Sequence, residues 1–204
     1  VSIAMTVFHG ANYLLLRTSG ELQVRARKVG IVAGAVTLLL FAIGGVWVYY
    51  GIPGYIASHL DPAGVANPLA KSVVMEEGAW FTNFRQYPAL YAVPALAIIA
   101  AGLGTLSQYV WKPLTAVISS AISILCIVLT PLIAMFPFVL PSSSHLVSSL
   151  TIWDCTSSQL TLQVMFIVTL IFLPLVLIYT SWAYKVMSGK LTVQYIKEND
   201  KTLY

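Results

Sequence analysis

The sequence predicts an all-α fold, a polytopic transmembrane helix bundle with about five spanning helices. Apolar residues make up 58% of the 204 residues and charged residues only 9%, whereas a soluble domain carries about 25% charged residues. Long apolar windows recur along the chain. A helix of about 20 apolar residues crosses a bilayer because it satisfies all its backbone N–H and C=O groups internally. Together these observations indicate an integral membrane protein.

Five windows meet or approach this length, and we expect them to form a single membrane domain over residues 1–204. The windows are 1–16, 29–50, 88–110, 114–136 and 160–184. The first is short and opens on Val1 without a soluble lead-in. We therefore expect Val1 to lie part-way into a helix and the chain to be a fragment. A secretory signal peptide is not predicted, since no basic segment precedes the apolar run.

The first window carries a polar stripe. On a helix with about 100° per residue its polar side chains fall on one narrow face, and they are Ser2, Thr6, His9, Tyr13 and Arg17. Polar groups are costly in hydrocarbon, so this face is expected to look into a bundle. His9 could relay protons or ligate a haem iron. A neutral histidine bonded to a neighbouring helix is the simpler interpretation, and Arg17 is interpreted as an anchor.

The second window is predicted to pack closely against other helices. Gly30 and Gly34 have the G-x-x-x-G spacing that lets helix backbones approach each other. For the long loop that follows, two interpretations stay open: a surface helix in the membrane interface, or a loop that covers a partner subunit. The apolar residues that would share one face of such a helix are Leu69, Val73, Trp80 and Phe84.

The later windows are bounded by recognisable helix signals. A short connection makes the third and fourth windows antiparallel neighbours, with Pro113 at the first helical position. Thr156 and Gln159 match a capping box that would begin the last helix. Trp153 and Asp154 form a candidate outer-loop cap, because a helix N-terminus favours negative charge. A proton-handling role for Asp154 is the alternative.

Basic residues indicate the orientation in the membrane. Nine of the eleven Lys and Arg residues follow the first, third and fifth windows; the two others are Lys71 and Arg85. By the positive-inside rule, the first and third connections and the C-terminus are cytoplasmic. The same distribution argues against a nucleic-acid partner, since the cations form no single patch.

Catalytic signatures are missing from the sequence. It contains no Walker loop, no H-E-x-x-H and no G-x-S-x-G. Cys126 and Cys155 are interpreted as small buried apolar thiols. Composition and spacing leave open a fragment of a secondary transporter, whose substrate site would need broken helices near Pro94, Pro131 or Pro174.

Several long segments resemble subunit II of the cytochrome bd-type quinol oxidases, in its C-terminal part. They include "GANYLLLRTSGELQVRARK", "NPLAKSVVMEEGAWFTNF", "SLTIWDCTSSQLTLQVM" and "LIYTSWAYKVMSGKLT", and they run from one end of the chain to the other. In that family subunit II is about twice this long.

The resemblance implies an accessory subunit in a bacterial cytoplasmic membrane. Its partner, subunit I, binds haem b and haem d, oxidises quinol and reduces dioxygen to water, which generates a proton-motive force. The resemblance further implies that this chain ligates no haem, lies among membrane lipid, and could hold a structural ubiquinone or menaquinone. A small single-span subunit is a further expected partner. No catalytic residue carries over.

Overall fold

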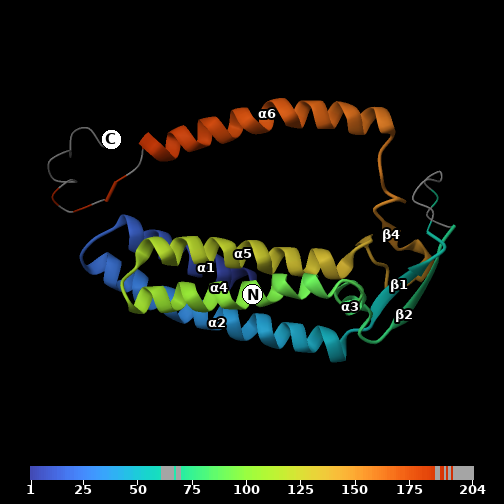
Figure 1. The fold of residues 1–204 in the computed structure, drawn as a ribbon, viewed down its shortest axis with the longest axis horizontal. Helices are drawn as coiled ribbons and strands as arrows, with labels where there is room; N and C mark the ends of the chain where they lie inside the picture. Colours follow the sequence, from blue (N-terminus) through green and yellow to red (C-terminus); the bar gives the residue numbers. More distant parts are fainter. Residues whose placement is uncertain (61–66, 68–69, 187–188, 191, 193, 195–204) are drawn as a thin grey trace.

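The computed structural model describes residues 1–60, 67, 70–186, 189–190, 192 and 194. Helices α1 (Ser2–Arg17), α2 (Glu21–Gly51), α4 (Ala92–Tyr109) and α5 (Pro113–Met135) lie side by side in alternating directions, and α6 (Gln159–Val186) runs along them (Figure 1). The predicted all-α membrane bundle is confirmed.

The helix bounds follow the predicted windows closely. Four segments are long and apolar enough to span a membrane: α2, 88–109, α5 and α6. The remaining window forms α1, which has 16 residues. Helix α2 begins about two turns earlier than its apolar window, because Glu21 supplies negative charge in its first turn and pairs with Arg25. Pro113 opens α5 as expected.

Small residues hold the four packed helices together. Phe8 of α1 is fully buried, and its ring lies against Gly34 of α2 and Gly104 of α4. A Cβ atom at either glycine would come within 2.9 Å of that ring. Glycine at these positions leaves room for the Phe8 ring where a Cβ atom would clash, which agrees with the predicted packing role of Gly34.

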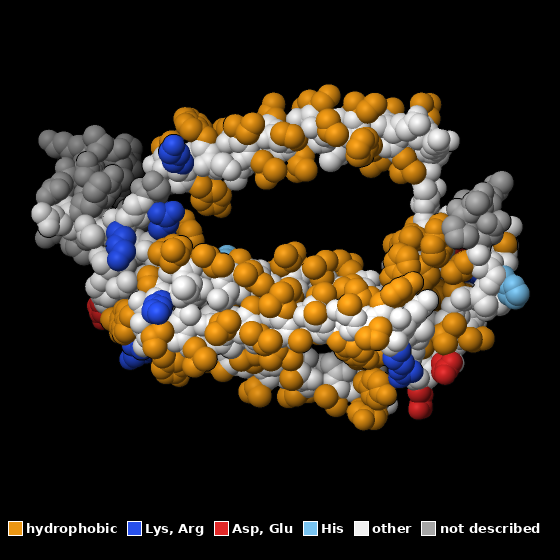
Figure 2. Space-filling view, in the orientation of Figure 1, with side chains coloured by type: hydrophobic (Ala, Val, Ile, Leu, Met, Phe, Trp, Pro, Cys, Tyr) orange, Lys and Arg blue, Asp and Glu red, His pale blue; other side chains and the backbone are white. Residues whose placement is uncertain are grey.

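Helix α6 differs from the other long helices in its surroundings. It buries none of its residues within the described part of the chain, and the space between it and the bundle is open in Figure 2. The segment that joins α6 to β4 is its visible link to the rest of the molecule (Figure 1). Helices α1, α2, α4 and α5 therefore form a packed unit without α6.

One end of the bundle is covered by a small cap. Two antiparallel strand pairs build it: β1 (Gly54–Ser58) with β2 (Ser72–Glu76), and β3 (Phe138–Leu140) with β4 (Leu150–Thr151). Short helical segments complete it: η1 (Ala79–Phe81), α3 (Thr82–Gln86), η2 (Pro88–Tyr91) and η3 (Leu146–Ser148). The opposite end holds the α1–α2 and α4–α5 connections and most of the Lys and Arg side chains seen in Figure 2, and we call it the basic end.

The predicted surface helix in the first outer loop is wrong. Val73 is buried while Ser72 and Val74 are exposed, which is the two-residue alternation of a strand. The β-branched pair Val73 and Val74 favours that strand, which pairs with β1. Phe84 is buried on α3 instead, and Leu69 lies outside the described residues.

Two predictions near the last helix are also wrong. The hydroxyl of Thr156 bonds to the carbonyl of Ile152, so it forms no capping box with Gln159. Ser158 occupies the N-cap position instead and accepts a hydrogen bond from the N–H of Thr161 at 3.4 Å. Cys155 is exposed, because it lies in the turn before α6, whereas Cys126 is buried as expected.

Candidate functional site

The polar stripe of α1 touches the described bundle at His9. The ring Nδ1 of His9 lies 2.8 Å from the hydroxyl of Ser120 on α5. The face of α1 that packs is a different one, formed by Phe8, Ala11, Asn12 and Leu15. Ser2, Thr6 and Tyr13 are exposed. That these residues pack against a partner therefore stays a prediction.

A second polar feature of α1 lies inside the bundle, one turn from Phe8. Moving one turn toward the basic end from the contact of Phe8 with Gly34 and Gly104 leads to Asn12, Gly30 and Gln108, because residues four apart share a helix face. A Cβ atom at Gly30 would lie 2.5 Å from Oε1 of Gln108. We call Asn12, Gly30 and Gln108 the amide layer.

The side chains of the amide layer have no polar partners. Asn12 and Gln108 are both 0% exposed, and no atom of either carboxamide finds a hydrogen-bond partner among the described residues. A buried unsatisfied amide costs about 1–3 kcal/mol. Sequence reasoning missed this layer. The available signal was the spacing of Phe8 and Asn12, which places Asn12 on the packing face.

Arg27 closes the bundle next to the amide layer. Its Nε donates to the backbone carbonyl of Gln108 at 2.7 Å, and its Nη2 donates to the carbonyl of Tyr109 at 2.9 Å. Its guanidinium also stacks over the ring of Trp111, 4.4 Å from the centroid. These bonds add to the backbone hydrogen bonds at the C-terminus of α4, so Arg27 fixes α2 to the α4–α5 connection.

At the opposite end, a buried ion pair joins the two halves of the cap. Nζ of Lys71, just before β2, lies 2.7 Å from Oδ2 of Asp154, just after β4, and the two side chains are 2% and 8% exposed. The same Oδ2 accepts hydrogen bonds from the backbone N–H and the hydroxyl of Thr151, at 2.9 and 2.6 Å. We call Lys71, Thr151 and Asp154 the clasp.

The clasp changes the interpretation of the candidate outer-loop cap. Asp154 was expected to cap the last helix, but α6 begins only at Gln159, and the carboxylate binds Lys71 and Thr151 instead. Trp153 packs edge-on against Phe136, with ring centroids 6.0 Å apart. Both residues therefore tie the second outer loop to the rest of the cap.

The electrostatics of the clasp favour the charged form of Asp154. Burial alone would raise the pKa of Asp154, but hydrogen bonds from Lys71 and Thr151 outweigh it, and the net pKa lies below its ordinary value. The carboxylate therefore stays ionised at neutral pH and is poorly suited to exchange protons there. The clasp is better suited to hold the two strand pairs together.

Close packing around Phe8 excludes a haem from one level of the bundle. The helices meet at glycine contact where Phe8 touches Gly34 and Gly104, so a porphyrin has no room between α1, α2 and α4. His9 already has its Nδ1 beside Ser120. In the described ranges, no three His, Cys, Asp or Glu side chains group closely enough to hold a metal ion.

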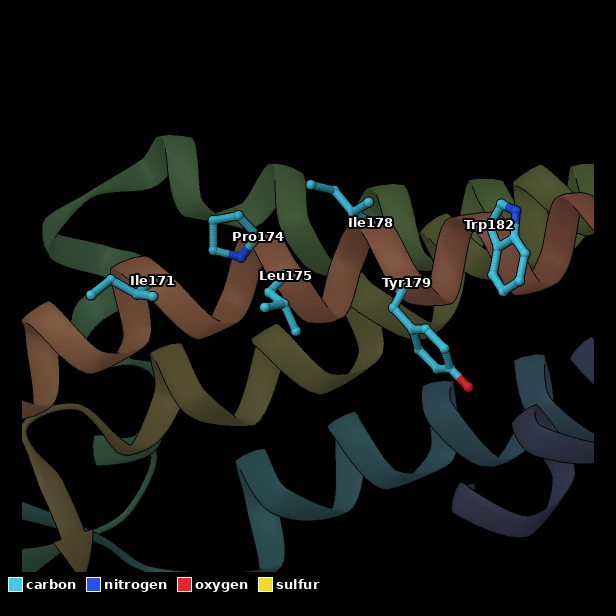
Figure 3. Close-up of a pocket in the computed structure, with 6 residues that line it drawn as sticks. All are labelled: Ile171, Pro174, Leu175, Ile178, Tyr179 and Trp182. Carbon is cyan, nitrogen blue, oxygen red and sulfur yellow. The ribbon is translucent and has the colours of Figure 1, made fainter.

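An apolar hollow of about 650 Å³ lies along α6. The side chains that line it all project from this one helix (Figure 3), and they are Ile171, Pro174, Leu175, Ile178, Tyr179 and Trp182. This hollow is therefore an exposed apolar face of α6. It could contact another molecule, but it holds no group of polar side chains.

Comparison with known proteins assigns the family. The family model described as "Cytochrome bd terminal oxidase subunit II" matches residues 1–187. The "Cytochrome bd-I ubiquinol oxidase subunit 2" of Escherichia coli (strain K12) is 47% identical over 205 residues, which cover 100% of this chain and 54% of that protein. The "Probable cytochrome oxidase subunit 2" of Haemophilus influenzae is 40% identical over 204 residues, with the same coverage.

The chain thus spans about half the length of the curated relatives that it matches, 54% in each case. The similarity runs along the whole of it, through the packed helices, the cap and α6. On this evidence the chain belongs to the cytochrome bd terminal oxidase subunit II family.

Proposed function

We propose that the chain acts within the second, accessory subunit of a bd-type quinol:dioxygen oxidoreductase. The observation that carries this proposal is 47% identity along the entire chain to a protein named as subunit 2 of a ubiquinol oxidase. In the proposed complex, haem b and haem d in a partner subunit I supply electron transfer from quinol to dioxygen. This chain binds and orients that partner.

Two surfaces support a binding role. Helix α6 buries no residue against the described bundle, and the stripe residues Ser2, Thr6 and Tyr13 are exposed. Apolar side chains on α6 are stable against lipid, but exposed polar side chains on α1 are costly in hydrocarbon, although the hydroxyl of Thr6 donates to the carbonyl of Ser2 at 2.9 Å. The stripe is therefore the surface that gains most from protein contact, and we propose that it packs against the rest of the oxidase.

The orientation proposed for the chain places the basic end in the cytoplasm and the cap outside. Arg17, Arg25, Arg27 and Lys28 lie around the α1–α2 connection, and Lys112 lies in the α4–α5 connection at the same end. This agrees with the positive-inside rule. The C-terminus is then cytoplasmic; Lys197 and Lys201 lie outside the described residues.

The alternative of a transporter fragment gains no support from the helices. A midplane substrate site would need discontinuous helices. Helix α5 runs through Pro131 and α6 runs through Pro174 without interruption, and Pro94 lies in the first turn of α4.

Affinity purification tests the proposed function. The intact subunit carrying an affinity tag would be purified from membranes of its host, and a reduced-minus-oxidised spectrum would be recorded. We expect haem b and haem d features together with quinol-dependent oxygen uptake. Purification without any haem-bearing partner, or solute flux without haem, would contradict the proposal.

A substitution at His9 tests the stripe separately. Replacing His9 with leucine in the intact subunit is expected to lower the haem recovered per subunit, because the stripe loses a polar contact. Ser2→Ala, at the exposed end of the stripe, is a milder companion variant. Unchanged haem content and unchanged oxygen uptake in both variants would leave His9 with a packing role through Ser120 only.

A further inference from the structure

A groove runs between α1 and α2 on the side of α1 away from the polar stripe. It has a volume of about 450 Å³, and its walls are apolar apart from Lys28. Ala4 and Val7 line it from α1; Val29, Val32, Ala33 and Val36 line it from α2. Val32 is 64% exposed, so the groove is open along its length to whatever surrounds the bundle.

The length of the groove along α2 is close to the thickness of the hydrocarbon part of one lipid leaflet. From Lys28 to Val36 the α2 axis rises about 12 Å, at about 1.5 Å per residue. Half of a bilayer's hydrocarbon core is about 15 Å thick. Since Lys28 is the lining residue nearest the basic end, the groove begins at the level of lipid headgroups and ends near the middle of the membrane.

Charge at the mouth of the groove favours an anionic occupant. Among the described residues, Lys28 forms no ion pair with an acidic side chain. Arg25, three residues earlier on the same face of α2, pairs with Glu21, but both of those side chains are largely exposed, so water screens the pair. A phosphate at this level would meet the ammonium of Lys28 directly. A quinone head is neutral, so it would form no ion pair with Lys28.

We propose that this groove is a binding site for one anionic phospholipid of the leaflet at the basic end. The phosphate pairs with Lys28, and one acyl chain lies along Val29, Val32 and Val36. Burial of the chain supplies affinity in proportion to the apolar area removed from water. The lysine supplies selectivity for a negative headgroup. The inference requires that the groove faces lipid in the intact subunit, and it does not depend on the proposed oxidase role.

Native mass spectrometry of the intact subunit in detergent tests the site, with phosphatidylglycerol and phosphatidylcholine as probes. The unmodified protein is expected to retain phosphatidylglycerol preferentially. Lys28→Gln should reduce that retention about fivefold, which is the effect of about one lysine at a membrane surface. Lys112→Gln is the matched control, because it removes the same charge from the same end at an exposed residue that does not line the groove.

A second variant tests the groove without changing charge. Val32→Trp fills it from an exposed position, so folding should be preserved, and retention of both lipids should fall together. Equal losses in the Lys28 and Lys112 variants would overturn the proposal, as would equal retention of both lipids by the unmodified protein. Recovery of a quinone in place of phospholipid, lost on Val32→Trp, would also overturn it.

Discussion

The cap and the basic end each contain an ion pair with the same nitrogen-to-oxygen distance and different surroundings. Lys71 and Asp154 in the cap, and Arg25 and Glu21 at the basic end, both have a nitrogen-to-oxygen distance of 2.7 Å. The cap pair is 2% and 8% exposed, whereas the other pair is 72% and 81% exposed. Burial, and not distance, therefore decides how much each pair matters to the fold.

The two regions also differ in how they satisfy buried polar groups. In the clasp, Oδ2 of Asp154 accepts from Lys71 and from both donors of Thr151. In the amide layer, Asn12 and Gln108 are equally buried but have no hydrogen-bond partner among the described residues. The buried polar side chains of the clasp are therefore paired, whereas the buried amides of Asn12 and Gln108 are packed without partners.

Removing the carboxylate of the clasp should have the largest effect. Asp154→Ala leaves the Lys71 ammonium buried without its partner, and breaking such a pair costs about 3–5 kcal/mol. We expect a lower midpoint of thermal unfolding in detergent and faster proteolysis of the cap. Glu77→Ala, at an exposed carboxylate in the same cap, is the control and should change neither measurement.

Acid should weaken the same contact without a mutation. The folded-state pKa of Asp154 is lowered, so its contribution to stability is complete above the ordinary carboxyl pKa of about 3.9. That contribution is lost as the pH falls through the lower folded-state value. Unfolding of the cap, followed by tryptophan fluorescence, should therefore become easier below about pH 4. The Asp154→Asn variant should lack this component, and an identical pH profile in both proteins would rule it out.

Enlarging a glycine of the amide layer should have an intermediate effect. A leucine at Gly30 would drive its Cβ into the side chain of Gln108, and overpacking of this kind costs about 1–3 kcal/mol. Gly44→Leu is the matched control, since it lies on the same helix and a Cβ atom there would meet no other atom within 4 Å. Equal thermal midpoints for the two variants would show that α2 and α4 are not held at contact distance.

Replacing the amide side chains should change the stability in the opposite direction to Asp154→Ala. Gln108→Leu removes a buried polar group that has no hydrogen-bond partner among the described residues, so stability should stay equal or rise by about 1 kcal/mol. The double variant with Asn12→Leu then gives the sum of the single effects. A coupling energy above about 0.5 kcal/mol would show that the two carboxamides bond to each other.

The spans could be predicted from sequence because the membrane restricts the solutions. An apolar window of the right length can satisfy its backbone in lipid only as a helix, so Pro113 and the boundaries of α5 followed directly. The clasp could not be predicted in this way. Lys71 and Asp154 are far apart in sequence, and their meeting depends on how β2 and β4 are placed.

The first helix shows what helical periodicity can predict and what it cannot. Helical periodicity predicts that His9, Tyr13 and the other stripe residues share one face, but it does not say which neighbour that face meets. The packing face proved to be the one with Phe8 and Asn12, because the glycines of α2 and α4 accept the Phe8 ring there. Which face of α1 packs therefore depends on the shape of the neighbouring helices, and the sequence of α1 alone does not specify it.

The smallest effect is expected at the exposed ion pair, and it completes the comparison. Glu21→Gln keeps the shape of the side chain and removes the charge that pairs with Arg25. Pairs of this kind, four residues apart on a helix, contribute about 0.3–0.5 kcal/mol and are screened by salt. The thermal midpoint should therefore move little, and raising the salt concentration should erase the difference. A loss as large as that of Asp154→Ala would mean that distance outweighs burial in this protein, and the contrast between its two ends would fail.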